Sequence, residues 1–420
     1  MQFSRRHFLV TTTAAATTLA APRAIGAARP KVVVIGGGAG GATAARYIAK
    51  DSKGAIDVVL IEPTRQYYTC FFSNLVLGGF RTFESIGHNY GKLASEYGIN
   101  VVHDWAVSVD RAGKAVSLAS GGKVSYDRLI VSPGIDFVDG SVPGWDVSAQ
   151  NVMPHAYKAG SQTQLLKAQV EAMPEGGTFV MAAPPNPYRC PPGPYERVSM
   201  VAHVLKAKNP KAKILVFDPK PKFSKMALFQ EGWQNHYPGM VEWVGGDFGK
   251  VLRVDPAAMT VSVEGETVKA AVCNVIPAQK AGHIAEVAGL TNEKGWCPIV
   301  PATMQSRIDE NVYVLGDATD NGDMPKSGFS ANSQAKVAAM AVRGSLLGSK
   351  VFPARYSNTC WSLIDTDDGV KVGGSYEATA DKIASTGGFI SKTGEDAALR
   401  KQTFEESLGW YAGITADMFG

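Results

Sequence analysis

The sequence has few cysteines, little net charge and no long apolar run. Its 420 residues contain five cysteines, and the formal net charge at pH 7 is +4. Such a charge does not indicate a nucleic-acid partner, because phosphate binding needs clustered positive charge. No Cys or His cluster has the spacing of zinc ligands, and there is no C-x-x-C-H haem motif. We therefore expect no metal site in this chain, and any haem would have to belong to a partner.

The first 28 residues have the pattern of a targeting segment. Residues 4–9 read SRRHFL, and a Thr/Ala-rich stretch follows that is too short and too polar to span a bilayer. This pattern predicts a twin-arginine signal peptide over residues 1–28, with an amphipathic helix of a cytoplasmic protein as the alternative. Removing Arg5, Arg6 and Arg23, with no acidic residue before residue 28, lowers the charge from +4 to +1. We expect a periplasmic protein whose mature chain has no integral membrane segment.

A complete dinucleotide-binding pattern follows the targeting segment. An apolar run over residues 31–35 leads into GGGAGG, then into a helical stretch and a second apolar run. Gly36, Gly38 and Gly41 fit the pattern G-x-G-x-x-G, in which glycines allow a tight turn, a close approach to pyrophosphate and close helix packing. Glu62 follows the second run, where an acid can bind ribose hydroxyls. The order of these elements predicts that these four residues bind a dinucleotide cofactor.

A second pattern of strand, helix and strand lacks the glycine turn. The apolar run over residues 178–183 leads into the proline-rich residues 184–194, a helical stretch over 195–206 and a strand ending at Asp218. Proline has no N–H to offer a phosphate, so this loop cannot hold pyrophosphate. We expect a second dinucleotide fold without a nicotinamide site, with Cys190 in place of that site.

The rest of the chain shows further strand and helix patterns. We expect a β meander over 101–131, a hairpin of strands 261–263 and 268–276, a buried strand over 311–318 and a helix over 330–346. The meander ends in a Ser-Pro-Gly turn, which is expected to return the chain to the first sheet.

These motifs resemble a known superfamily. The glycine turn, the Ser-Pro-Gly turn and the VLGDA strand occur in the order found in two-dinucleotide-fold flavoproteins similar to glutathione reductase. Within this superfamily, four features resemble the flavoprotein subunit of flavocytochrome c sulfide dehydrogenase. They are YYTCFFSN (67–74), the proline-flanked Cys190, SNTCW (357–361) and SLGWYAG (407–413). The resemblance implies an α/β protein with two Rossmann-like domains and a small C-terminal α+β domain.

The resemblance also implies a division of the chain. We expect a signal peptide (1–28), an FAD-binding domain in two parts (29–142 and 279–350), a second dinucleotide fold (143–278) and a C-terminal cytochrome-interface domain (351–420). The last part carries Trp361, Trp410, Tyr411 and Phe419, which we expect at a partner surface. The core of a small domain is the alternative.

The cofactor residues follow from the same resemblance. In that family FAD is attached through a cysteine thioether, and a c-type cytochrome subunit accepts the electrons. The resemblance implies covalent attachment at Cys70, with an unreactive buried cysteine as the alternative. Asp317 is expected at the ribityl chain, or else as a helix cap. Lys326 is expected near the pyrimidine end of the flavin, or else as a solvated loop lysine.

The remaining cysteines and one glutamate complete the expected site. The resemblance implies a redox disulfide between Cys190 and Cys360, with a plain structural disulfide as the alternative. Glu196, in the first turn of a helix, is expected to transfer protons, although the helix dipole alone favours an acid there. Cys273 and Cys297 are expected to form a structural bridge or to be buried thiols.

Together these roles imply a sulfide dehydrogenase. Sulfide would be oxidised to sulfur or polysulfide through the disulfide and FAD, and a c-type cytochrome subunit would accept the electrons in a heterodimer. One alternative is a peripheral membrane flavoenzyme similar to sulfide:quinone oxidoreductase, although the tail over 397–419 has only a modest amphipathic face. Another is a non-catalytic periplasmic flavin electron carrier. A nicotinamide-dependent reductase is disfavoured by the proline-rich loop.

Overall fold

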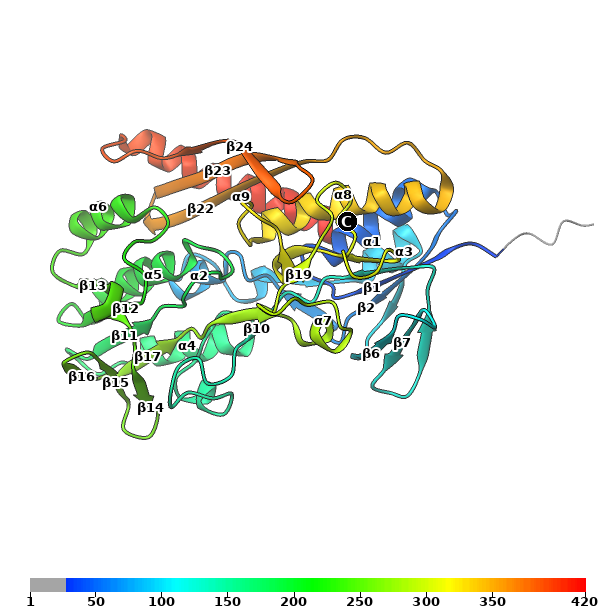
Figure 1. Ribbon diagram of the computed structural model, residues 1–420. Coiled ribbons are helices and arrows are strands. Elements are labelled where there is room, and N and C mark those ends of the chain that lie inside the picture. The colour runs from blue at the N-terminus through cyan, green and yellow to red at the C-terminus, as the bar shows by residue number, and fades with distance from the viewer. Residues whose placement is uncertain (1–27) are drawn as a thin grey trace, which may run out of the picture.

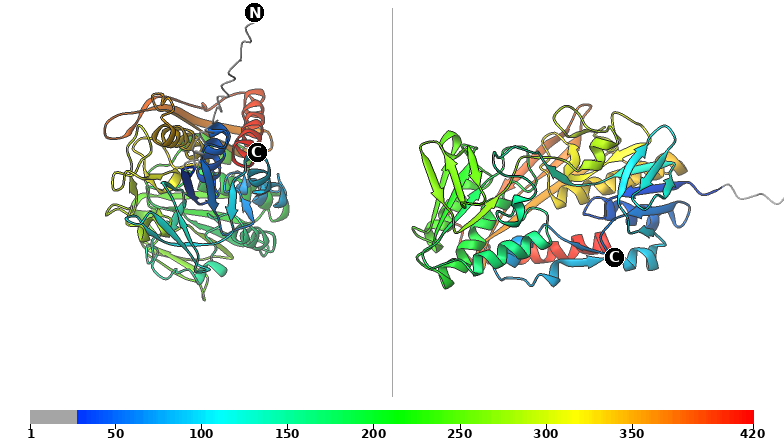
Figure 2. Two further views of the ribbon diagram at one scale, coloured as in Figure 1. Left: turned by 90° about the vertical axis from the view of Figure 1, so that its right-hand side faces the viewer. Right: turned by 90° about the horizontal axis from the view of Figure 1, so that it is seen from below.

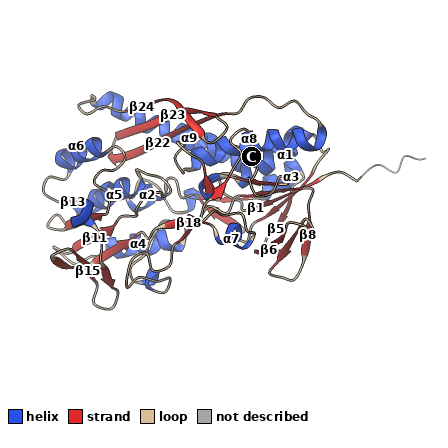
Figure 3. Ribbon diagram, viewed as in Figure 1, coloured by secondary structure: helices blue, strands red, loops and turns tan. Residues whose placement is uncertain are grey.

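The computed structural model describes residues 28–420, so the predicted signal peptide lies outside the described residues except for Ala28. Two α/β units lie at opposite ends of the molecule, and a three-stranded sheet with a long helix runs along one side of both (Figure 1). Helices and strands alternate in both units, as Figure 3 shows by colour. The predicted α/β architecture with a small C-terminal domain is confirmed.

The first unit is built on a five-stranded parallel sheet with the order β20-β9-β1-β2-β5. Its strands are β1 (Lys31–Ile35), β2 (Asp57–Ile61), β5 (Asn100–Val102), β9 (Arg128–Val131) and β20 (Val312–Val314). The valines of β1 are fully buried, which fits a parallel sheet covered on both faces. Helices α1 (Gly41–Ser52) and α8 (Gly328–Leu347) pack against each other beside this sheet.

The second unit has a four-stranded parallel sheet with the order β13-β12-β11-β17. Its strands are β11 (Thr178–Ala182), β12 (Lys213–Asp218), β13 (Val241–Gly245) and β17 (Val272–Val275), and its helices are α4 (Ser161–Glu171), α5 (Gly193–Lys208) and α6 (Met226–His236). The predicted second dinucleotide fold is therefore present. The proline-rich loop connects β11 to α5, the position of the glycine turn in the first unit.

The expected strand over 268–276 is wrong as a single element. It divides into β16 (Glu266–Lys269), which pairs with β15 (Thr260–Val263) and β14 (Arg253–Asp255) in an antiparallel sheet, and β17 of the parallel sheet. The division falls at two alanines: Ala270 N–H bonds to Met259, whereas Ala271 N–H bonds to Thr178. An alternating pattern cannot reveal such a change of sheet, because the side chains continue to alternate through it.

The C-terminal domain joins the two units. Strands β22 (Arg355–Asp365), β23 (Asp368–Ala378) and β24 (Ile383–Ile390) form an antiparallel sheet, and α9 (Ala397–Phe419) packs against β23 and α1. Strand β22 packs against α5 of the second unit and α8 of the first. The view from below in Figure 2 shows α9 lying along the molecule. Residues on β22 are thereby placed between the two units.

Two of the aromatic residues expected at a partner surface lie inside the fold. Tyr411 and Phe419 are buried, and their rings lie 4.5 Å from Phe72 and 4.9 Å from His88, respectively, between ring centroids. The expectation of a partner surface is therefore wrong for these two residues. Helix α9 is part of the core around residues 67–72, and its aromatic side chains stabilise that segment.

The remaining elements are short. They are β3 (Gln66–Tyr68), α2 (Ser73–Leu77), η1 (Glu84–Ile86), β4 (Gly87–Asn89), α3 (Gly91–Tyr97), β6 (Ala106–Asp110), β7 (Ala115–Leu118), β8 (Lys123–Ser125), β10 (Ile135–Phe137), η2 (Ala149–Asn151), η3 (Gly246–Gly249), β18 (Gln279–Ala281), α7 (His283–Val287), β19 (Cys297–Pro298), η4 (Gly316–Ala318) and β21 (Thr319–Asp320). Among residues 28–420, no helix has both the length and the apolar character needed to cross a membrane.

Candidate active site

The glycine turn after β1 has a backbone that only glycine can adopt. Gly36 has a φ of 95°, and a Cβ there would lie 2.3 Å from the Ser132 carbonyl oxygen. A Cβ at Gly41 would lie 1.9 Å from the Gly36 carbonyl oxygen. The Gly37 N–H donates to Glu62 Oε2 at 2.8 Å, so the acid predicted to bind ribose lies directly beside the turn.

Two further residues fit a dinucleotide cofactor at this turn. The Cβ position of Gly38 lies 3.3 Å from the Tyr67 hydroxyl, so a larger side chain would crowd the turn. Asp317 is buried, and its Oδ1 atom has no hydrogen-bond partner in the protein. A buried carboxylate oxygen without a partner indicates a ligand donor, and the hydroxyls of a ribityl chain are such donors. The residues predicted to hold FAD therefore fit it.

Asp317 and Lys326 are both buried, and each influences the pKa of the other. The pKa of Asp317 is raised by burial, while the positive charges of Arg189 and Lys326 oppose that rise. The Lys326 ammonium donates to the Thr319 carbonyl oxygen and lies 3.7 Å from the centre of the Trp296 ring. Burial lowers the pKa of Lys326 to about 8. Lys326 is thus not a solvated loop lysine, and that alternative is wrong.

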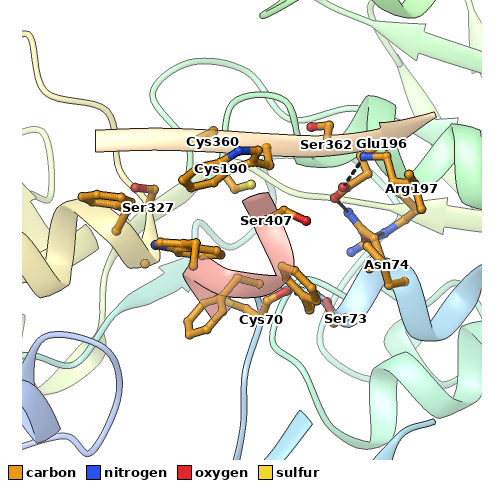
Figure 4. Close-up of a pocket in the computed structure, with 18 of the residues that line it drawn as sticks. Cys70, Ser73, Asn74, Cys190, Glu196, Arg197, Ser327, Cys360, Ser362 and Ser407 are labelled. Atoms are coloured by element: carbon orange, nitrogen blue, oxygen red, sulfur yellow. Dashed lines mark hydrogen bonds between the residues drawn. The ribbon is translucent and has the colours of Figure 1, made fainter. Parts of the chain in front are cut away.

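Three cysteines from distant parts of the sequence line one pocket. Cys70 lies between β3 and α2, Cys190 lies in the proline-rich loop, and Cys360 lies in the middle of β22. The cavity between them measures about 80 Å³, enough for a few groups the size of water or hydrosulfide. Cys190 and Cys360 lie next to each other in Figure 4. All five cysteines are thiols in this structure, so the disulfide stays a prediction.

The backbone of the proline-rich loop fixes the position of Cys190. This residue has a left-handed φ of 54°, which a non-glycine residue adopts only when its surroundings impose it. Its N–H donates to the Lys326 carbonyl oxygen at 2.8 Å, and its own carbonyl oxygen accepts from Gly193 N at 2.8 Å and from the Tyr157 hydroxyl at 3.2 Å. A Cβ on Gly193 would lie 3.0 Å from Cys190 Sγ. The sulfur therefore sits tightly against the first residue of α5.

Cys360 has polar neighbours on β22 and α8. The Asn358 side-chain amide donates to Cys360 Sγ at 3.6 Å, and Asn358 Oδ1 accepts from the hydroxyls of Ser327 and Ser330 at 2.5 Å and 3.2 Å. Burial raises the pKa of the Cys360 thiol, and the positive charge of Lys225 is the largest influence that lowers it. This sulfur is thus held beside a hydrogen-bond donor and a buried cation.

The Glu196 carboxylate faces the pocket and does not cap its own helix. Its Oε2 accepts from the Asn74 amide at 2.8 Å, and its Oε1 accepts from the Leu363 N–H at 3.0 Å (Figure 4). Burial raises its pKa, and these two donors oppose the rise. A carboxyl group with a raised pKa beside two cysteines keeps its proton to a higher pH than a free glutamate does and can exchange it with them.

The raised pKa of Glu196 leads to a testable pH dependence of stability. The folded protein binds this proton more tightly than the unfolded chain, so the associated stability is fully present below the unfolded pKa of about 4.3. That stability is lost as the pH rises through the folded pKa. In urea denaturation, Glu196→Gln should therefore show a flatter dependence of the free energy of unfolding on pH. The exposed Glu175→Gln is the control, and parallel curves for wild type and Glu196→Gln would contradict the raised pKa.

Three buried cations near the pocket, Arg189, Arg197 and Lys225, were not predicted from the sequence. The Arg197 guanidinium donates to the carbonyl oxygens of His155 and Ala156 at 3.0 Å and 2.6 Å, and Lys225 donates to the Cys360 carbonyl oxygen at 3.1 Å. Arg197 follows Glu196 directly in the sequence, and this adjacency could have identified Arg197 as a residue near the site. Lys225 lies in an ordinary loop before α6, and no sequence pattern marks it.

Asp218, the acidic residue at the end of β12, binds side chains of the second unit. Asp218 is fully buried and accepts hydrogen bonds from the Tyr195 hydroxyl at 2.5 Å and from Trp243 Nε1 at 3.1 Å. Lys220 Nζ lies 2.6 Å from the same carboxylate and also donates to the Pro184 carbonyl oxygen. The carboxylate is therefore already satisfied by protein groups, which agrees with the predicted absence of a nicotinamide site.

The other two cysteines lie outside the pocket. Cys273 on β17 and Cys297 on β19 are both buried thiols in separate apolar clusters, and burial raises the pKa of each to about 12. The expected alternative of a structural bridge between them is wrong, and the buried-thiol alternative is confirmed. Within residues 28–420, no three His, Cys, Asp or Glu side chains are grouped to hold a metal ion.

Comparisons with known proteins agree with this geometry. The profile of the pyridine nucleotide-disulphide oxidoreductases matches residues 30–171, the segment with the glycine turn and Glu62. The fold and site thus define a flavoprotein of the disulphide-oxidoreductase class. The profile of the central part of the sulfide dehydrogenase (flavocytochrome c) flavoprotein chain matches residues 163–277, and that of the flavocytochrome c sulphide dehydrogenase flavin-binding domain matches residues 353–419. Over these two segments the chain is similar to this family of flavoproteins, as its motifs predicted.

Solved structures share the fold at low sequence identity. The sulfide:quinone oxidoreductase of Aquifex aeolicus is 19% identical, with a TM-score of 0.70 over 92% of each chain. The NAD-dependent persulfide reductase of A. fulgidus is 16% identical, with a TM-score of 0.62 over 90% of this chain and 77% of that one. A ferredoxin reductase of Rhodopseudomonas palustris is 18% identical, with a TM-score of 0.63 over 87% and 89%. These likenesses establish the fold alone.

Proposed function

We propose that this chain oxidises sulfide through a redox disulfide formed by Cys190 and Cys360. The observation that carries the proposal is that both cysteines, together with Cys70 and Glu196, line one small pocket between the two units. This arrangement agrees with the family to which the chain is similar over residues 163–277 and 353–419. A non-catalytic electron carrier would have no use for a cysteine pair placed in this way.

The chain's own residues account for the sulfur chemistry. Hydrosulfide attacks one sulfur of the disulfide, so that one S–S bond forms while the other breaks. One cysteine then carries a persulfide, and the other leaves as a thiolate with the displaced electron pair. Glu196 is in position to accept the proton of the attacking hydrosulfide, because its carboxylate faces the same pocket.

The predicted cofactor residues complete the proposal. Gly36, Gly38, Gly41, Glu62 and Asp317 would hold FAD, and Cys70 would attach it covalently. When bound there, FAD supplies an acceptor that takes two electrons and releases them one at a time. We propose a c-type cytochrome subunit as the next acceptor, and we propose that the chain is exported to the periplasm by the twin-arginine route.

Spectroscopy of the holoprotein tests this function. Under anaerobic conditions, sulfide should bleach the flavin absorbance completely, whereas NADH should leave it unchanged because a proline-rich loop replaces the glycine turn that would bind its pyrophosphate. Dithionite serves as the control that shows a reducible flavin. Ferric cytochrome c should then restore the absorbance, while restoration only by a quinone would favour the sulfide:quinone oxidoreductase alternative. Failure of sulfide to bleach a dithionite-reducible flavin would overturn the proposal.

A further inference from the structure

Lys225 is a buried lysine without an ion-pair partner among residues 28–420. It lies immediately before α6, and its ammonium group donates to three neutral acceptors on the C-terminal sheet. These acceptors are the Cys360 carbonyl oxygen at 3.1 Å, the Ser362 hydroxyl at 2.8 Å and the Val370 carbonyl oxygen at 3.3 Å. A buried charge is costly unless it is hydrogen-bonded, and three donors with three acceptors meet that requirement.

The backbone at Lys225 adds a second observation. Its φ is 63°, in the left-handed region that favours glycine or asparagine. A lysine is thus held in a strained conformation at a position where glycine would be the simplest choice for the chain. Such strain is concentrated at functional sites, where the surrounding structure imposes it. The surroundings that hold this conformation include the three hydrogen bonds of the side chain.

The charge of Lys225 is directed at the cysteine pair. Burial lowers the pKa of Lys225 to about 8, while the negative charges of Cys360, Glu196 and Cys190 oppose that decrease. Arg197 is another buried cation near the pocket, and its hydrogen-bond acceptors are also neutral, whereas the buried Arg189 lies 3.8 Å from the Asp317 carboxylate. Because anionic cysteines raise the pKa of Lys225 and its charge lowers the pKa of Cys360, the ammonium group and a thiolate at the pair stabilise each other.

We propose that Lys225 is a positioning residue for the cysteine pair. Its ammonium group holds β22 at Cys360 and Ser362, and the neighbouring β23 at Val370, and supplies the positive charge that stabilises an anionic sulfur at the pair. The inference rests on the proposed function, because the attack of hydrosulfide on the disulfide is the step that leaves one of the two cysteines as a thiolate. Lys225 is a positioning residue and not a catalytic one, because it does not line the pocket that holds the two cysteines.

The test measures thiol reactivity in the reduced holoprotein, without sulfide. Methyl methanethiosulfonate is a small thiol reagent, and peptide mass spectrometry reports its reaction at Cys360 as a function of pH. The titratable groups facing Cys360 are Cys190, Glu196, Lys225 and Tyr376, and all except Lys225 stay unchanged. The Lys225→Gln variant keeps a hydrogen-bond donor but loses the charge. Its midpoint should rise by about one pH unit, which corresponds to an about tenfold lower thiolate fraction at a pH below the midpoint.

Two controls separate charge from structure. Lys222→Gln removes an exposed lysine from the same loop and should leave the profile unchanged. Lys225→Arg keeps the charge and should retain the wild-type midpoint even if its bulk lowers the melting temperature. A folded Lys225→Gln protein with a wild-type midpoint, or an equal shift in Lys225→Arg, would overturn the inference. The proposed function fails in a different experiment, namely if sulfide does not bleach the flavin of the wild-type protein. The pH profile of thiol reactivity does not depend on that result.

Discussion

Replacing either Cys190 or Cys360 by alanine is expected to lower sulfide oxidation by at least about a thousandfold while FAD stays bound. Neither residue belongs to the glycine turn or contacts Glu62, so cofactor binding does not depend on them. Each cysteine is half of the disulfide that hydrosulfide must attack, and a single thiol cannot be displaced by thiol–disulfide exchange. Anaerobic stopped-flow absorbance of the flavin after mixing with sulfide measures the loss.

Dithionite reduction and the flavin content of the purified variants are the internal controls. Cys273→Ala is the matched control, because it also removes a buried thiol but lies in a separate apolar cluster. It should keep near-normal turnover. A purely structural disulfide between Cys190 and Cys360 would instead make the variants less stable by about 2–4 kcal/mol with catalysis preserved. Near-normal turnover in a folded Cys190→Ala protein would contradict the mechanism.

Replacing Cys70 by alanine should convert a flavin that denaturant cannot release into one that it releases completely. Cys70 lies at the edge of the same pocket, in a segment held by its neighbours: the Ser73 hydroxyl donates to the Cys70 carbonyl oxygen at 2.6 Å, and Tyr411 packs against Phe72. The alanine variant should fold and bind FAD non-covalently, because Glu62 and the glycine turn are unchanged. Acid precipitation followed by absorbance of the supernatant measures the released flavin.

The intact mass of denatured, exported wild-type protein provides an independent measurement. It should exceed the mass of the polypeptide by one FAD, and it also reports where the proposed signal peptide is cleaved. Cys297→Ala, which removes a buried thiol outside the pocket, should keep the added mass. If the wild-type flavin is already extractable, or if the mass equals that of the polypeptide alone, covalent attachment at Cys70 is wrong.

Placing the C-terminal helix inside the fold changes one expectation about truncation. The resemblance implied that the tail meets a partner, so its removal would spare flavin reduction by sulfide. In the structure, Tyr411 bonds to Thr69 and His88 at 3.2 Å and 3.0 Å, next to Cys70. Removing α9 would expose this aromatic core and disturb the segment that carries Cys70. The half-buried Trp361 and Trp410, whose ring centroids lie 5.4 Å apart, line the pocket.

The sequence by itself determined the two dinucleotide folds and the residues of the glycine turn. Gly36, Gly41 and Glu62 could be assigned because their roles depend on local backbone geometry over a few residues. The same holds for the proline-rich loop, since a missing N–H is a property of the residue itself. The helices over 42–49, 195–206 and 330–346 were placed within three residues of their observed ends by the same local patterns.

Only the tertiary structure decided what surrounds the cysteines. Cys360 meets Cys190 because β22 crosses between the two units, and no local pattern encodes that crossing. Lys225 lies beside Cys360 because the start of α6 packs on the sheet that contains β22. Tyr411 and Phe419 are core residues because α9 packs on segments far from it in the sequence. Burial and charge in this pocket arise from segments far apart in sequence, and these long-range contacts set the pKa of each sulfur.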